Sequence, residues 1–206
     1  MKTAAETTFD RIIKESFQEH LKPLGFKKKG NNFYLQLQGL GQIINIQKSM
    51  YYSKSQIKFT INTGIFIPEY WLAHFTFHNG ELPLYPTESQ CAIRQRIGWL
   101  KYKHDKWVEV NETTEGDALV AEMKDNVLNY ILPYFETAKT KKDILQLLDN
   151  KQLSMTHVFT KLIIYGEYQE FDKAQKEYNN LLNDKYIVAN LKSSLDEYKV
   201  KYGLHG

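Results

Sequence analysis

The chain has a single cysteine, few prolines and no long hydrophobic run. Because Cys91 stands alone, an internal disulfide and a zinc site built on several thiolates are both excluded, which is typical of a reducing compartment. The first residues lack the charged start and apolar run of a secretion signal, and no window approaches the roughly 18 apolar residues of a membrane-spanning helix. We therefore expect a soluble, cytoplasmic protein without a membrane partner.

A strong excess of one charge is also absent, since the net charge is only +3. Residues 1–111 carry 15 basic and 9 acidic side chains, whereas residues 112–206 carry 12 basic and 15 acidic ones. This mild asymmetry falls short of the basic surface that nucleic-acid binding requires, so the sequence gives nucleic acid little support as a partner. Aromatic residues are plentiful at 14%. The many tyrosines indicate either half-buried rings whose hydroxyls contact water or a surface that contacts a partner.

The first half of the chain predicts a helix followed by an antiparallel sheet. Apolar residues at helical spacing over 6–22 predict an amphipathic helix that ends at Pro23 and Gly25. A basic turn at 27–32 precedes the strand-like segments, which are about 33–37, 43–50, 56–66, 91–100 and 107–110. Short connections between consecutive strands predict an antiparallel meander of four to five strands. Residues 67–90 hold three prolines and no clean period, which favours a long structured loop or lid.

From Thr114 onward the apolar period changes from two to three or four, which is typical of helices. Helical segments are expected at about 143–149, 153–165, 168–183 and 187–201. The sequence therefore predicts an α+β fold with an N-terminal helix, the meander sheet and a C-terminal helical bundle packed on or beside that sheet. We divide it into an α+β domain at 1–138 and a helical extension of helical hairpins at 139–206.

The order of several motifs resembles a known family. These motifs are Leu24–Gly30 with Phe33-Tyr34, then Ile44–Ser49, Phe59–Pro68, Cys91–Leu100 and the strand at Trp107. Together they resemble the bacterial domain of unknown function 4304 family from about residue 9 to at least 138. The resemblance implies an α+β fold and a bacterial cytoplasmic setting, and it supplies no catalytic residue.

Polar side chains interrupt the apolar strands of the predicted sheet. Alternation places Asn45, Gln47 and Ser49 on one face and Lys48 on the other. The candidate binding residues are Asn45, Gln47, Lys48, Ser49, Asn62, Arg94, Arg96 and Trp107. Two explanations remain open: either these groups bind a ligand or partner, or the amides form side-chain ladders and the arginines cover apolar surface.

Other chemistries have weaker support in the sequence. Only His74 and His78 are close enough to share a helical face, and no third metal ligand accompanies them. Cys91 precedes two arginines that would lower the thiol pKa if it were exposed, but a lone cysteine opening a strand is more often a buried hydrophobic residue. The strands carry no carboxylate pair for acid–base chemistry. We therefore assign no catalytic residue, metal or cofactor.

Three functional hypotheses follow. The first is a non-enzymatic binding or protein-interaction module, with immunity-like neutralisation of a partner protein as one setting suggested by analogy. The alternative is an enzyme or small-ligand binder that recognises an anionic compound through Lys48, Arg94 and Arg96. A third option, single-stranded nucleic acid on the aromatic and lysine surface, would require strongly salt-dependent binding.

Overall fold

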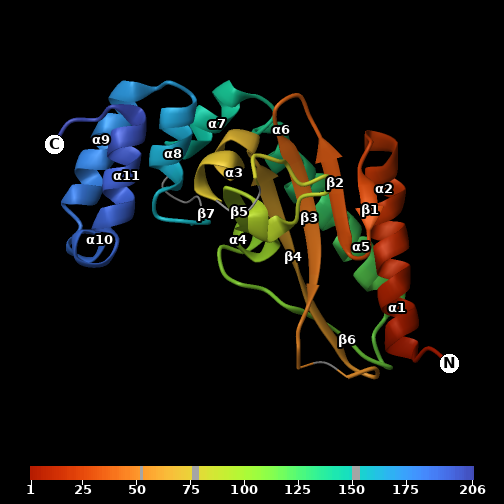
Figure 1. Cartoon of the computed structure of the whole chain (residues 1–206). Coiled ribbons are helices and arrows are strands. Elements are labelled where there is room, and N and C mark those ends of the chain that lie inside the picture. Colours follow the sequence, from red (N-terminus) through yellow and green to blue (C-terminus); the bar gives the residue numbers. More distant parts are fainter. Residues whose placement is uncertain (52, 76–78, 150–153) are drawn as a thin grey trace.

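A computed structural model describes residues 1–51, 53–75, 79–149 and 154–206 of the chain. In these ranges seven strands form one antiparallel sheet in the order β1-β2-β3-β4-β5-β7, with β6 paired to β4 (Figure 1). The strands are β1 (Lys27–Lys29), β2 (Asn32–Gln36), β3 (Gly41–Lys48), β4 (Ile57–Phe66), β5 (Ile93–Arg96), β6 (Val108–Val110) and β7 (Ser154–Met155). The α+β class and the antiparallel sheet predicted from the sequence are thus confirmed.

Helices precede, separate and follow the strands along the chain, and they continue beyond the sheet toward the C-terminus. The α-helices are α1 (Ala4–Ile12), α2 (Glu19–Leu21), α3 (Pro68–His74), α4 (Ile97–Lys101), α5 (Gly116–Asn126), α6 (Leu132–Glu136), α7 (Lys141–Leu148), α8 (Thr160–Glu167), α9 (Phe171–Leu182), α10 (Lys185–Asn190) and α11 (Lys192–Tyr202). Two π-helical segments, η1 (Ile13–Gln18) and η4 (Val127–Ile131), and two 3₁₀ turns, η2 (Lys22–Leu24) and η3 (Glu88–Gln90), complete the list.

The N-terminal helix begins and ends where local chemistry requires. Thr3 and Glu6 form a capping box, in which each side chain accepts a hydrogen bond from the other residue's backbone N–H. At the far end Pro23 enters the 3₁₀ turn, and Gly25 adopts a left-handed backbone with φ of 92°. This turn reverses the chain, so that β1 runs back along the helix that precedes it.

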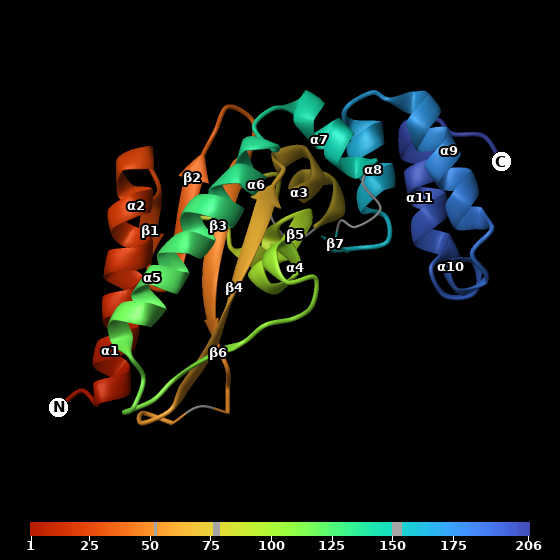
Figure 2. The same cartoon turned by 180° about the vertical axis from the view of Figure 1, so that it is seen from behind.

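One face of the sheet packs on two helical segments, α1 with η1 and α5 with η4. In Figure 2 α5 lies in front of β3 and β4, whereas in Figure 1 it lies behind them. Phe9 meets Phe59 edge-on at 5.3 Å between ring centroids, and Phe17 stacks with Phe33 at 6.0 Å. These rings belong to one continuous apolar core that also includes side chains of the C-terminal helices. We call this the helix face of the sheet.

On the opposite face the Thr60 hydroxyl donates to the carbonyl oxygen of Lys106 at 2.9 Å, so the loop before β6 covers this point. A larger cover lies near the ends of β3 and β4 that adjoin α3. There a smaller apolar cluster joins Tyr34, Ile43, Phe66, Trp71 and Cys91. Residues 79–92 and α3 lie over this part of the sheet in Figure 1. Toward the other end of β3 and β4 the face carries polar side chains, and we call this the open face.

The C-terminal helices lie beyond the β5 side of the sheet, away from β1 (Figures 1 and 2). β7 links them to the sheet because Met155 pairs with Ile93 and Ser154 pairs with Arg94. The hydroxyl of Thr156 also donates to the carbonyl oxygen of Cys91. Residues 139–206 therefore contribute a strand as well as helices, which the sequence pattern did not indicate.

Four predicted segments differ from the structure. Residues 27–29 form the edge strand β1 rather than a basic turn, and α3 occupies the start of the predicted loop 67–90. The strand predicted at 91–100 ends at Arg96, where α4 begins, and the helix predicted at 153–165 begins at Thr160. With β1 and β7 added, the sheet exceeds the four to five strands that we expected.

Candidate functional site

A row of hydrogen-bonded amides crosses the open face over three strands. Asn45 pairs with Asn62 across β3 and β4, and with Asn32 across β2 and β3. The Asn45 amide donates to Asn32 at 2.7 Å, and the Asn62 amide donates to Asn45 at 3.2 Å and to Gln47 at 2.9 Å. Asn62 is 4% exposed, whereas Gln47 is exposed. We call this set of four residues the amide ladder.

Arg96 extends the amide ladder toward a loop residue and a tryptophan. Its Nε donates to Asn62 Oδ1 and its Nη1 donates to Asp105 Oδ2, both at 2.9 Å. The Trp107 indole N–H donates to the same Asp105 oxygen at 3.1 Å, and the Arg96 guanidinium lies 5.6 Å from the Trp107 ring centroid. Burial raises the pKa of Asp105, but the Arg96 hydrogen bond and charge outweigh it, so the pKa lies below its usual range.

Arg94 shares the sheet face of Arg96 but is held by a different acid. Its guanidinium donates to both carboxylate oxygens of Glu88, at 2.5 and 2.8 Å, and Glu88 is 8% exposed. This bidentate pair lies beside Cys91, which is fully buried. Burial, reinforced by the Glu88 charge, raises the pKa of the Cys91 thiol well above its usual value. Cys91 is therefore a buried apolar residue of the core, not an exposed thiolate.

Lys48 lies on the helix face, away from both arginines. Its ammonium stands 4.1 Å from the centroid of the Phe9 ring on α1. Arg94 and Arg96 project from the opposite face. There Arg94 forms an ion pair with Glu88, and Arg96 forms an ion pair with Asp105 and a hydrogen bond with Asn62. The structure thus does not bring together the three cations that the anionic-ligand alternative requires.

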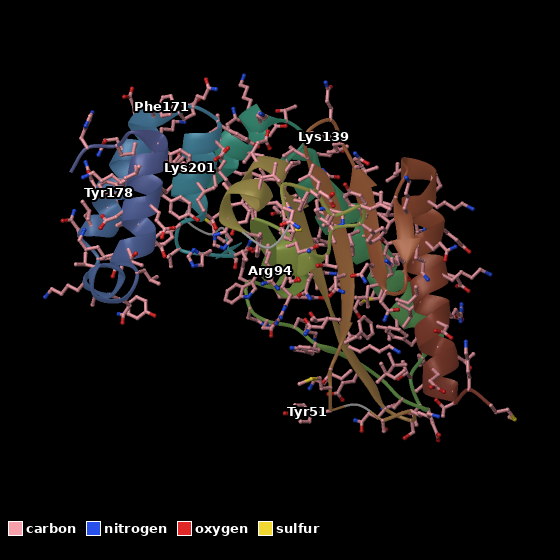
Figure 3. All side chains as sticks on the ribbon, in the orientation of Figure 1. Tyr51, Arg94, Lys139, Phe171, Tyr178 and Lys201 are labelled. Carbon is pink, nitrogen blue, oxygen red and sulfur yellow. The ribbon has the colours of Figure 1, made fainter. Side chains whose placement is uncertain are left out.

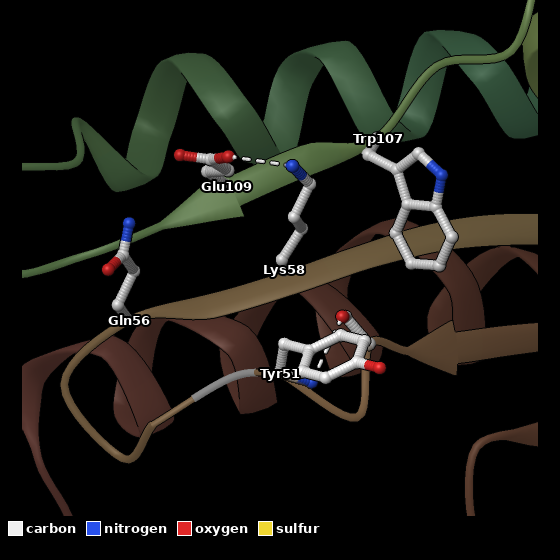
Figure 4. Close-up of a pocket in the computed structure, with 6 residues that line it drawn as sticks. Tyr51, Gln56, Lys58, Trp107 and Glu109 are labelled. Atoms are coloured by element: carbon white, nitrogen blue, oxygen red, sulfur yellow. Dashed lines mark hydrogen bonds and ion pairs between the residues drawn. The ribbon is translucent and has the colours of Figure 1, made fainter.

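A shallow hollow adjoins the amide ladder at the start of β4, the end of this strand away from α3. It has a volume of about 330 Å³ and is lined by Ser49, Tyr51, Gln56, Lys58, Trp107 and Glu109 (Figure 4). Lys58 and Glu109 form an ion pair of 3.1 Å across paired strands. Tyr51 is 94% exposed at the tip beyond β3, far from Arg94 in Figure 3. An accessible aromatic ring therefore stands beside balanced charges and hydrogen-bonding groups.

Of the sequence candidates, the open face brings together Asn45, Gln47, Asn62 and Arg96, and the hollow brings together Ser49 and Trp107. The sequence analysis missed the acids Asp105 and Glu88 that hold the arginines, and the hollow residues Tyr51, Lys58 and Glu109. Alternation along β4 and β6 places Lys58 and Glu109 on the same face as Asn62 and could have indicated those two. Asp105 and Glu88 lie outside the strands, so strand alternation could not have indicated on which face their side chains lie.

The two histidines that could share a helical face, His74 and His78, cannot be compared directly in the structure. His78 lies outside the described residues, and His74 instead meets His157, with 4.7 Å between ring centroids. Within the described ranges no group of three or more histidine, cysteine or acidic side chains could hold a metal ion. Over the same ranges no helix is both long enough and apolar enough to cross a bilayer.

Comparison with known proteins places this architecture in a family. No functionally curated protein and no solved structure shows significant similarity to the chain. The model of a domain of unknown function, DUF4304, matches residues 17–137, which hold the amide ladder, Arg96, Asp105 and the hollow. Because this match covers more than half of the 206 residues, the chain belongs to the DUF4304 family.

Proposed function

We propose that the protein is a non-enzymatic interaction module whose open face docks a partner protein. The observation that carries this proposal is the amide ladder next to the hollow at Trp107 and Tyr51. Amide groups in fixed positions match the donors and acceptors of a polypeptide. Tyr51 is exposed and Trp107 is half-buried, and Trp and Tyr are residue types that anchor protein interfaces. The fold holds this surface rigidly because it lies on central strands.

The charge arrangement supports a polar, electrically balanced partner surface. Arg96 is paired with Asp105, Arg94 with Glu88, and Lys58 with Glu109. Each of these cations already has a carboxylate partner, so a small anion would have to displace one. This arrangement favours a protein surface that hydrogen-bonds to the pairs over a highly charged ligand.

Chemical groups on this face favour binding over catalysis. Cys91 is buried with a raised thiol pKa, so it is not poised as a nucleophile. Asp105 is paired with Arg96, and its lowered pKa keeps it ionised rather than available as a general acid. Glu88 is held by Arg94 in a bidentate pair. Immunity-like neutralisation of another protein in a bacterial cytoplasm is the setting that we propose for such a module.

Site-specific photo-crosslinking in the native host tests the proposed docking surface. A photoreactive residue placed at Gln47 or Lys58 is expected to give a discrete adduct, whereas one at Lys14 or Lys176, both exposed on other surfaces, is not. The partner identified in this way should bind Trp107→Ala and Gln47→Arg variants about tenfold or more weakly, since central interface residues carry most binding energy. Adducts of equal yield from all four positions, or none from the open face, would contradict the proposal.

A further inference from the structure

A second recess lies at the edge of the sheet, between the N-terminal helical segment and β1. It has a volume of about 310 Å³ and is lined by Gln18, Lys22, Phe26, Lys27, Lys28 and Phe33. We call it the β1 crevice; α2 and β1 lie side by side in both views of the fold (Figures 1 and 2). It belongs to the helix side of the sheet, whereas the amide ladder lies on the open face.

The chain reversal at Gly25 creates this crevice. Backbone N–H groups of Gly25 and Phe26 donate to the carbonyls of Lys22 and Leu21, at 3.0 and 3.2 Å, and Gly25 has a positive φ. This tight turn sets β1 directly against the helix end instead of continuing the helix. Phe26 and Phe33 form an apolar floor, and each ring is fixed by a partner, Phe26 by Phe135 at 6.1 Å and Phe33 by Phe17 at 6.0 Å.

Three lysines line the crevice, of which Lys27 pairs with Tyr34 and so starts from the other face of the sheet. Lys28 pairs with Phe33 across β1 and β2, so the two side chains share the helix face of the sheet, and Lys22 approaches from the end of the helical segment. Lys29, next along β1, points to the other face, where its amine lies 5.7 Å from the Tyr85 ring centroid. Strand alternation therefore directs Lys28 into the crevice and Lys29 away from it.

Neither Lys22 nor Lys28 has an acidic partner within the described part of the chain, whereas all three arginines and eight of the other lysines do. The Gln18 amide likewise makes no hydrogen bond within that part of the chain, and it borders the same space. An apolar floor, two unpaired ammonium groups and an amide donor together match an anion attached to an apolar group.

We propose that the β1 crevice binds a phosphate monoester that carries a small apolar group. Two ammonium groups match the charge of a phosphate near −2, and lysine binds phosphate as a point charge. The volume lies at the small end of the usual range for ligand pockets, which limits the apolar part to about one ring. This inference is independent of the protein-docking surface, because the two sites share no residue.

Calorimetric titration of the full chain with phenyl phosphate tests this site. The paired variant Lys22→Gln/Lys28→Gln removes the two amines assigned to the ligand and leaves Lys27 in place. The matched pair Lys14→Gln/Lys29→Gln removes the same charge from the same two segments outside the crevice. We expect saturable binding that weakens about tenfold or more in the first pair and changes less than about twofold in the second. Inorganic phosphate, which lacks the ring, and benzyl alcohol, which lacks the charge, are both expected to bind more weakly than phenyl phosphate.

Three results would overturn the proposal. One is the absence of saturable phenyl phosphate binding up to about 10 mM, a concentration at which even weak specific sites fill. Another is equal weakening in both variant pairs, which would indicate general charge attraction instead of a site. The third is binding to phosphatidic acid vesicles without binding to soluble phenyl phosphate, which would assign the lysines to a membrane surface. Thermal melting of every variant confirms that each one is folded.

Discussion

Lowering the pH from 7 to 5 is expected to destabilise the fold through the contact between His74 and His157. This contact joins α3 to the segment that leads into α8, and Tyr70 and Tyr198 enclose it. Tyr70 stacks on His74 at 5.1 Å, and the Tyr198 hydroxyl lies 3.4 Å from His74 Nδ1. Burial, followed by the nearby His157, lowers the pKa of His74 from 6.5 to about 4, and burial also lowers the pKa of His157.

The direction of the effect follows from proton linkage. A folded-state pKa below the unfolded value means that the unfolded chain binds the proton more tightly between the two values. Stability is therefore unaffected well above pH 6.5, falls as the pH drops from 6.5 toward about 4, and levels off below that. At pH 5 these two pKa values give a loss of about 2 kcal/mol for His74, and its partial exposure reduces this to about 1 kcal/mol.

Urea unfolding at pH 7 and at pH 5 measures this loss directly. The His74→Phe variant keeps an aromatic ring against Tyr70 but cannot accept the proton, so its stability should change less between the two pH values than that of the wild type. A Lys176→Gln variant, exposed on α9, serves as the control and should retain the full pH dependence. If His74→Phe loses as much stability as the wild type on acidification, His74 is not the group responsible and the reasoning fails.

Three further perturbations test the packing around the site. Asn62→Ala removes the two hydrogen bonds that the Asn62 amide donates and the one that it accepts from Arg96. We expect urea titrations to show a loss of about 2–3 kcal/mol of unfolding free energy. A loss below about 1 kcal/mol would show that water replaces these hydrogen bonds at little cost. Gly64→Ala would set a Cβ 2.5 Å from Cys91 Sγ and 2.9 Å from Cys91 Cβ. We expect thermal melting to show a loss of about 1–3 kcal/mol of stability from this overpacking. An unchanged melting temperature would be inconsistent with the contact. Residues 1–138 and 139–206 share one apolar core, so removal of 139–206 would expose core side chains of the remaining chain. We expect this shortened chain to bind a hydrophobic dye and to melt over a broad temperature range. A sharp melt would instead support a self-sufficient domain at 1–138.

Local sequence patterns were sufficient to predict the long central strands. β3 and β4 have eight and ten residues with clear apolar alternation or a buried run, and both were predicted close to their observed bounds. β1 and β7 have three and two residues, too few for any period to be visible. The end of β5 at Arg96 depends on tertiary packing, because Gly98 in α4 fits closely against the backbone of residues 104–106. No local signal reports such a contact.

The same distinction holds for the candidate site. Alternation correctly grouped Asn45 with Gln47 and separated Lys48, since face assignment depends only on position along one strand. The partners of Arg94 and Arg96 lie in irregular segments before and after β5, and the two contacting histidines are far apart in the chain. Pairings of this kind depend on the path of the whole backbone, so the sequence suggested a polar surface without showing that its cations were already paired.

The position of the two proposed sites determines how they should influence each other. The amide ladder and the hollow lie on the open face, whereas Phe33 and Lys28 place the β1 crevice on the helix face at the sheet edge. β2 connects them, because Asn32 belongs to the ladder and its neighbour Phe33 to the crevice floor. A phosphate ester in the crevice would therefore not occlude a protein on the open face, and coupling between them would have to pass through a shift of β2. Since the Phe17–Phe33 stack and the Asn32–Asn45 hydrogen bond both hold β2 in place, we expect the two binding events to be independent, with additive effects of variants at the two sites.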